Sequence, residues 1–83
     1  MERTELAEEI IDFCIKYKIM NNPEKLVTAK FRIAEQLYKS WFVESLIHTL
    51  IVKTKYIKNV DNKKLKYLLM KLEKIRLDLE YDE

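Results

Sequence analysis

The closing stretch of the chain, KKLKYLLMKLEKIRLDLEYDE (Lys63–Glu83), decides the fold class. Apolar residues recur in it three and four positions apart, the spacing that places side chains on one face of an α-helix. The members of this row are Leu65, Leu68, Leu72, Ile75 and Leu79. Because they alternate like the a and d positions of a coiled coil, the stretch predicts a helix that packs against other helices.

The first half of the chain repeats this helical pattern. A first helix is predicted to begin at Thr4, whose hydroxyl can cap free backbone N–H groups. Its apolar stripe comprises Leu6, Ile10, Phe13, Cys14, Tyr17 and Met20. The sequence NNPE at 21–24 then predicts a helix end followed by a new start, since Pro23 suits the first position of a helix. A second helix continues from there to about Tyr38.

The stretch around residues 38–41 leaves the number of helices open at three or four. The apolar stripe beyond it is rotated relative to the second helix, and Ser40 is a candidate cap for a third helix. Trp41, the only tryptophan, is expected to be buried where these two helices meet. Further on, Asp61 or Asn62 is expected to cap the last helix.

The absence of glycine from all 83 residues limits both fold and function. Phosphate-binding loops, dinucleotide fingerprints and nucleophile elbows need glycine where the backbone turns tightly, and so do many β-hairpins. Short connections between amphipathic helices favour antiparallel neighbours. The sequence therefore predicts an all-α fold with one domain over residues 1–83, a small up-down antiparallel bundle of three to four helices.

Candidate catalytic and metal-binding groups are few. Cys14 and His48 are the only cysteine and histidine, whereas a zinc site needs about four ligands. Cys14 is expected to pack as a small apolar residue, and His48 to face solvent. The carboxylates of the first helix (Glu5, Glu8, Glu9 and Asp12) suit the positive end of its dipole. We expect no enzyme activity, no metal and no cofactor. The lone cysteine and the acidic start, which is unlike a signal peptide, favour a cytoplasmic location.

The charge distribution keeps a second function class open. The basic segment Lys53–Arg76 holds nine basic and two acidic residues, a net charge of +7, although the whole chain carries only +2. Such a segment with interleaved tyrosines is typical of surfaces that contact phosphates. The candidate nucleic-acid contacts are Lys53, Lys55, Lys58, Lys63, Lys64 and Lys66. The competing interpretation is a solvated face whose lysine stems cover apolar surface.

A second apolar row on the last helix points to a protein partner. Tyr67, Met70, Leu77 and Tyr81 lie on the side opposite the leucine row, and we call these four residues the outer stripe. An exposed apolar patch of this kind tends to mark an interaction site. The alternative is that another helix of the same bundle covers it. The sequence favours a non-enzymatic interaction module, an adaptor or regulator that binds a protein partner or forms a homo-oligomer. A nucleic-acid-binding regulator is the second hypothesis.

Overall fold

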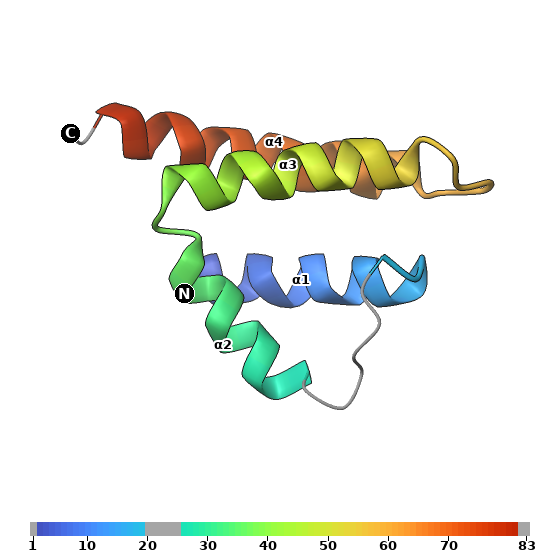
Figure 1. Cartoon of the computed structure of the whole chain (residues 1–83), viewed down its shortest axis with the longest axis horizontal. Helices are drawn as coiled ribbons and strands as arrows, with labels where there is room; N and C mark the ends of the chain where they lie inside the picture. The colour runs from blue at the N-terminus through green and yellow to red at the C-terminus, as the bar shows by residue number, and fades with distance from the viewer. Residues whose placement is uncertain (1, 20–25, 82–83) are drawn as a thin grey trace.

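Four α-helices make up the part of the chain that the computed structural model describes, residues 2–19 and 26–81 (Figure 1). They are α1 (Glu2–Lys16), α2 (Leu26–Gln36), α3 (Ser40–Thr54) and α4 (Asn62–Tyr81). The predicted all-α bundle is therefore confirmed, with four helices. The expected NNPE boundary lies outside the described residues. The first helix begins at Glu2, two residues before the predicted start, so Thr4 lies inside it.

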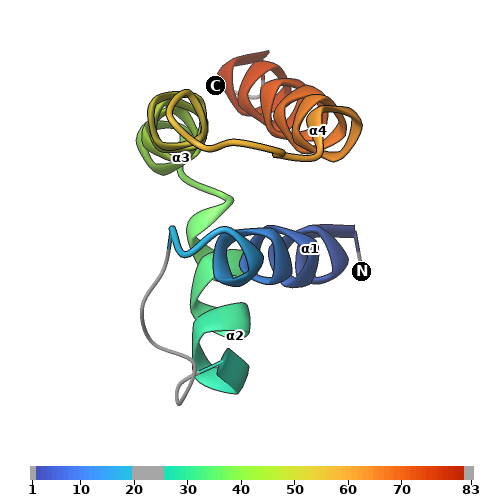
Figure 2. The ribbon, with the colours of Figure 1, turned by 90° about the vertical axis from the view of Figure 1, so that its right-hand side faces the viewer.

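The helices form two pairs; α3 and α4 run antiparallel, and α2 runs obliquely to α1 and α3 (Figures 1 and 2). In Figure 1, α3 and α4 lie side by side along their length, and α1 runs beneath them; the views of Figures 1 and 2 together show α2 crossing α1 obliquely. The packing between α3 and α4 and between α1 and α2 is extensive, whereas α1 meets α4 over a shorter stretch. The connection from α2 to α3 is short, spanning Leu37 to Lys39.

The core lies between the pairs and is centred on α1, which contributes six of the thirteen buried apolar residues in the described part of the chain. These six are Leu6, Ala7, Ile10, Ile11, Phe13 and Cys14. Helices α3 and α4 contribute four residues that are fully buried against these six: Val43, Leu50, Leu68 and Leu72. The leucine row of α4 thus faces the core, with its centre buried and Leu65, Ile75 and Leu79 partly buried at its margins, as the spacing predicts.

Helix α1 ends in a Schellman motif made without glycine. Lys18 adopts a left-handed conformation with φ of 58°. The N–H of Ile19 donates to the carbonyl of Cys14 at 2.7 Å, and the N–H of Lys18 donates to that of Ile15 at 3.1 Å. These two bonds satisfy carbonyls that the helix end leaves free. Asn59, with φ of 62°, also adopts the left-handed conformation, in the turn between α3 and α4.

The helix break near residue 39 is real, but two local expectations at this break are wrong. Lys39 is the cap residue of α3, no side chain bonds the free N–H groups there, and Ser40 is the first helical residue. Trp41 is 64% exposed rather than buried. The break turns α3 so that Val43 faces the core, while Leu37, fully buried, fills the junction that Trp41 was expected to occupy.

Helix α4 begins with the predicted side-chain cap. Asp61 Oδ1 accepts a hydrogen bond from the backbone N–H of Lys64 at 3.1 Å, the geometry of an aspartate at the cap position. The backbone N–H of Asp61 in turn donates to the hydroxyl of Tyr17 at 2.8 Å. This bond joins the end of α1 to the start of α4 and fixes the turn against the core.

Candidate interaction surface

The outer stripe of α4 lies on the surface, apart from one residue at its edge. Met70 is 63% exposed, Leu77 41% and Tyr81 86%. No helix of the described chain covers them, so the alternative of a helix sandwiched inside its own bundle does not apply to these three. Isolated exposed apolar residues are common on protein surfaces. Three of them on one helical face form an exposed patch.

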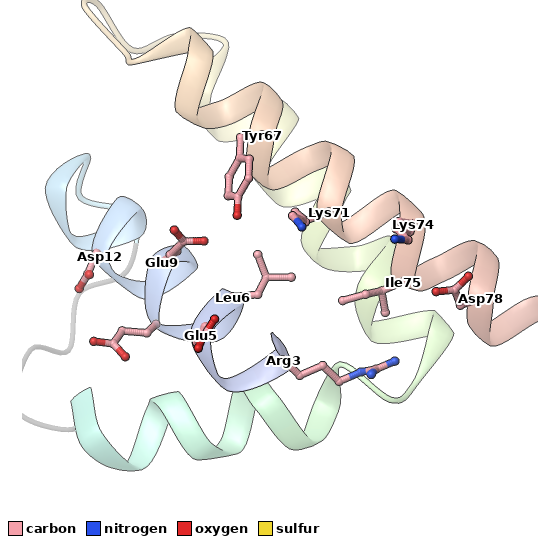
Figure 3. A pocket seen from close by; sticks show the side chains of 11 residues that line it. Arg3, Glu5, Leu6, Glu9, Asp12, Tyr67, Lys71, Lys74, Ile75 and Asp78 are labelled. Atoms are coloured by element: carbon pink, nitrogen blue, oxygen red, sulfur yellow. The ribbon is translucent and has the colours of Figure 1, made fainter. Parts of the chain in front are cut away.

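Tyr67 occupies a different environment from the rest of the stripe. Its ring, 38% exposed, points from α4 towards α1, beside Leu6 and Glu9 (Figure 3). The ammonium groups of Lys64 and Lys71 lie 5.0 and 5.6 Å from the centre of the ring, within reach of cation–π attraction. Tyr67 is therefore a border residue between the outer stripe and the space separating α4 from α1.

That space is an open groove of about 440 Å³ along the shorter α1–α4 contact. Leu6 and Ile75 supply its apolar part, and charged side chains supply the remainder, as Figure 3 shows. Acidic groups on it come from both helices, for example Glu5 and Asp78, and basic groups include Lys71. Charges of both signs on opposite walls suit solvated ion pairs.

Arg76 organises the side of α4 that faces α3. Its guanidinium bonds Glu73 and lies 2.7 Å from Glu80 and 3.8 Å from Glu44 of α3. The hydrogen bond from Arg76 holds the pKa of Glu73 below its usual value, and the same bond raises the pKa of Arg76. This network connects α4 to α3. The guanidinium of Arg76 is already bound by the carboxylates of its neighbours.

Five of the six candidate lysines are exposed, and the sixth, Lys64, forms an ion pair. Lys64 contacts Glu9 of α1 at 2.9 Å, so its charge is partnered across the two helix pairs. The others are exposed on the last turn of α3, the following turn and the first turns of α4, where Tyr56 is 81% exposed beside them. These five are Lys53, Lys55, Lys58, Lys63 and Lys66.

A second hollow, of about 760 Å³, lies at the same end of the molecule. It sits where α3, the turn and the start of α4 meet, and its apolar lining includes Ile51, Val60 and Leu69. Lys55 and Lys66 also line it. The hollow therefore combines an apolar surface with positive charge, at the opposite end of α4 from its acidic last turn.

Exposed apolar residues on α3 are one part of the surface that sequence reasoning missed. Trp41, Ile51 and Val52 are 64%, 50% and 41% exposed. The apolar residues of α3 extend all around the helix, so periodicity alone does not separate its inner from its outer face. The recurrence of Trp41, Ser45, His48 and Val52 at helical spacing is the signal that could have identified this outer line.

The two remaining candidate groups, Cys14 and His48, lie in ordinary structural environments. Cys14 is 1% exposed, and burial raises its pKa to about 11; His48 is exposed on α3. Within residues 2–19 and 26–81, no three His, Cys, Asp or Glu side chains gather closely enough to hold a metal ion. None of the helices in those ranges has both the length and the apolar character of a membrane span.

Comparison of the chain with protein-family models, with curated proteins and with solved structures finds no match to any of them.

Proposed function

We propose that the chain is a small, non-enzymatic interaction protein of the cytoplasm that acts by binding another protein chain through the outer stripe of α4. The proposal casts it as an adaptor or regulator without a cofactor or a small-molecule substrate. The observation that supports it is the solvent exposure of Met70, Leu77 and Tyr81 on one face of a helix whose opposite face forms the core.

The residue types in this patch add support. Tyr and Met are enriched in the cores of protein interfaces, where a few large side chains supply most of the binding free energy. A charged neighbour of the patch on α4, Lys66, would contribute to a polar rim around it. The groove between α1 and α4 offers no comparable constellation, because its charges are spread along both walls.

Site-specific photo-crosslinking in the cells that produce the protein tests this proposal. A photoreactive amino acid replaces Met70 in one variant and His48, which is exposed on α3, in a control variant. We expect position 70 to form covalent protein adducts that position 48 does not form. Adding Leu77→Glu to the position-70 variant should remove those adducts while circular dichroism stays helical.

Two results would contradict the proposal. One is a set of adducts that is identical for positions 70 and 48. The other is loss of helical structure in the Met70→Glu, Leu77→Glu double variant at low protein concentration, which would place the stripe inside the core. Loss of the adducts when Leu77→Glu is added to the photoreactive position-70 variant, with the helical signal kept, supports the proposal directly.

We propose nucleic-acid binding as a second candidate function, favoured by the five exposed lysines and Tyr56 at one end of the molecule. Contacts to several phosphates would make the affinity fall steeply with salt, with a log–log slope of about −0.9 per phosphate neutralised on duplex DNA. Fluorescence anisotropy with labelled duplex and single strands measures this slope.

A matched pair of variants separates a specific surface from general positive charge. Changing Lys58, Lys63 and Lys66 to Gln should abolish binding, whereas Lys64→Gln removes a lysine already paired with Glu9 and should matter little. No binding at low salt would reject this candidate, and so would binding that survives the triple change.

A further inference from the structure

The hollow at the α3–α4 turn has an apolar floor. The half-buried side chains that line it are Ile57, Val60, Leu65 and Leu69. Thr54 also lines it, but its hydroxyl is buried and donates to the carbonyl of Leu50 at 2.6 Å. Because this hydrogen bond satisfies the hydroxyl inside the protein, the floor does not require a polar partner there. The group that fits the floor is therefore apolar.

The charged side chains that line the hollow are both basic. Lys55 follows α3 and Lys66 lies in α4, and both are exposed. Within residues 2–19 and 26–81, neither lysine lies within ion-pair distance of a carboxylate. The turn itself extends beyond the end of α1 along the length of the molecule (Figure 1), so α1 does not lie over this end. Both ammonium groups are thus available to an anionic partner.

The sequence around the hollow adds positive charge and almost no negative charge. Residues 45–72 contain seven lysines and a single acidic residue, Asp61. The carboxylate of Asp61 is occupied, because it accepts the backbone N–H of Lys64 at the start of α4. Further lysines are exposed in the last turn of α3, in the turn and at the start of α4, namely Lys53, Lys58 and Lys63. An apolar floor inside a positive field is complementary to a group that is apolar at its centre and negative at its edges.

From this arrangement we infer that the hollow is a second docking site, which binds an acidic peptide segment of another protein. A large apolar side chain of that segment enters the hollow, and aspartate or glutamate residues beside it pair with Lys55 and Lys66. The inference goes beyond the proposed function, because this surface differs from the outer stripe and its partner has a stated chemistry. A chain with both surfaces would hold two proteins together.

The lining and the shape of the hollow favour a peptide over other anionic partners. Unpaired bases bind by stacking on aromatic rings, and none of the described residues that line the hollow is aromatic. Its charged groups are lysines and not arginines, whose planar fork suits phosphate. The flat surface of an anionic bilayer would leave a concave floor unfilled, whereas a side chain can enter a hollow of about 760 Å³.

Selection from a random peptide library displayed on phage, with the full chain as the target, identifies the probe. We expect the selected peptides to carry aspartate or glutamate on both sides of one large apolar residue. The affinity of a labelled selected peptide is then measured by fluorescence anisotropy. Changing its apolar residue to serine, or its acidic residues to their amides, should each weaken binding by at least about tenfold. Added salt should also weaken it, because exposed charges are screened.

Two matched pairs of variants on the α3 side locate the binding site. Lys55→Glu should raise the peptide dissociation constant at low salt by at least about tenfold, whereas Lys53→Glu should change it by less than about twofold. Both changes alter the net charge equally and lie at the same end of α3, but only Lys55 lines the hollow. Ile51→Ala should raise the constant about fivefold, whereas Val52→Ala should not. Ile51 and Val52 are 50% and 41% exposed, and only Ile51 lines the hollow.

Several results would overturn the inference. A library that yields no binding peptide, or only peptides without acidic residues, would do so. Equal effects of the two changes within each pair of variants would place the peptide elsewhere on the surface. Duplex DNA or phosphatidylserine vesicles that bind with the same dependence on Ile51 and Lys55, in the absence of a selected acidic peptide, would assign the hollow to those partners instead.

The proposed function is tested separately from this inference. Its photo-crosslinked adducts form at position 70 of α4, and they should persist when Ile51→Ala or Lys55→Glu is added to the photoreactive variant. Persistent adducts without peptide binding would overturn the docking site alone. Peptide binding that depends on Ile51 and Lys55, without specific adducts at position 70, would support the docking site and contradict the proposed role of the outer stripe.

Discussion

Trp41 and its neighbours illustrate how one residue's burial controls its energetic importance. The indole lies edge-on to Phe42, with ring centres 6.0 Å apart, and the Lys39 ammonium lies 6.0 Å from the Trp41 ring. These contacts occur on the surface, where water remains close. Leu37, four residues earlier, is fully buried and holds α2 and α3 together.

We expect Trp41→Ala to change the free energy of unfolding by no more than about 0.5 kcal/mol, the usual range for surface substitutions. Leu37→Ala should cost about 2–5 kcal/mol, because it empties a fully buried site. Urea titrations followed by circular dichroism compare the two variants. A large loss of stability in Trp41→Ala would show that the indole packs inside the protein.

Cys14 makes the stability of the protein depend on pH in the alkaline range. Burial raises its pKa from 9.0 to about 11, so the folded state holds a proton that the unfolded chain releases earlier. The contribution of a raised pKa is complete below the unfolded value and is lost as pH rises through the folded one. Between these values the free energy of unfolding should therefore fall, by about 1.4 kcal/mol for each pH unit.

The variant Cys14→Ala isolates this effect. The difference in the free energy of unfolding between wild type and Cys14→Ala should be constant below pH 9 and shrink above it, because only the wild type carries the thiol. Denaturant titrations across this range provide the measurement. A difference that does not change with pH would mean that the buried thiol ionises as easily as a free one.

At the scale of the helix, α4 combines a capped start, a buried face and a solvated face. The cap comes from Asp61, the buried face from Leu68 and Leu72, and the solvated face from the outer stripe. Each part contributes separately to stability or to binding, so single substitutions can change one part without the others.

Removing the cap should weaken α4 without altering its surface. Asp61→Ala leaves the N–H of Lys64 without its side-chain acceptor and should cost about 1 kcal/mol. Asp61→Asn keeps an oxygen at the same place and should stay within a few tenths of a kcal/mol of wild type. Thermal unfolding of both variants tests the cap. An equal loss of stability in both would mean that the negative charge of Asp61, and not its hydrogen bond, stabilises the helix.

The two faces of α4 should respond differently to the same truncation. Leu72 is fully buried and Leu77 is 41% exposed. Leu72→Ala should lower the free energy of unfolding by about 2–5 kcal/mol, whereas Leu77→Ala should cost less than about 1 kcal/mol. The comparison is made at a protein concentration low enough to avoid association. Similar costs at both positions would mean that Leu77 belongs to the core.

Helical periodicity predicts much of this element and little of its neighbour. The leucine row of α4 follows from spacing, because polar residues separate the two apolar faces. The sequence offers Asp61 or Asn62 as the cap, and it leaves open whether another helix covers Met70. In α3 apolar residues surround the helix, so the exposure of Trp41 depends on the rotation set by the break at Lys39. Tyr67 likewise sits at the edge of its stripe, and only the position of α1 determines that its ring turns inward.

For the whole molecule, the decisive feature is the unequal packing of the four helices. The pairs α1–α2 and α3–α4 each pack closely, and the seam between α1 and α4 is shorter and bordered by an open groove. The ion pair between Glu9 and Lys64 and the hydrogen bond between Tyr17 and Asp61 cross between the pairs. Sequence spacing predicts each helix separately, but it carries no information about which pairs pack closely.

A double-mutant cycle on Glu9 and Lys64 measures the electrostatic part of this seam. Glu9→Gln, Lys64→Gln and the combined variant should give a coupling of about 0.2–1 kcal/mol that shrinks with added salt, since both side chains are partly exposed. The cycle on Glu8 and Lys30, which joins α1 to α2, is the matched reference. A coupling free energy of zero between Glu9 and Lys64 at low salt would show that this ion pair does not stabilise the contact between α1 and α4.

The buried position of Cys14 has a practical consequence for following motion in this protein. A thiol-specific reagent can modify Cys14 only in molecules whose core has opened around α1, because the side chain is 1% exposed in the closed form. The rate of labelling under native conditions therefore reports how often that opening occurs. Since the chain has no other cysteine, the wild-type protein carries this probe without substitution, and a ligand or partner that closes the seam would slow the labelling.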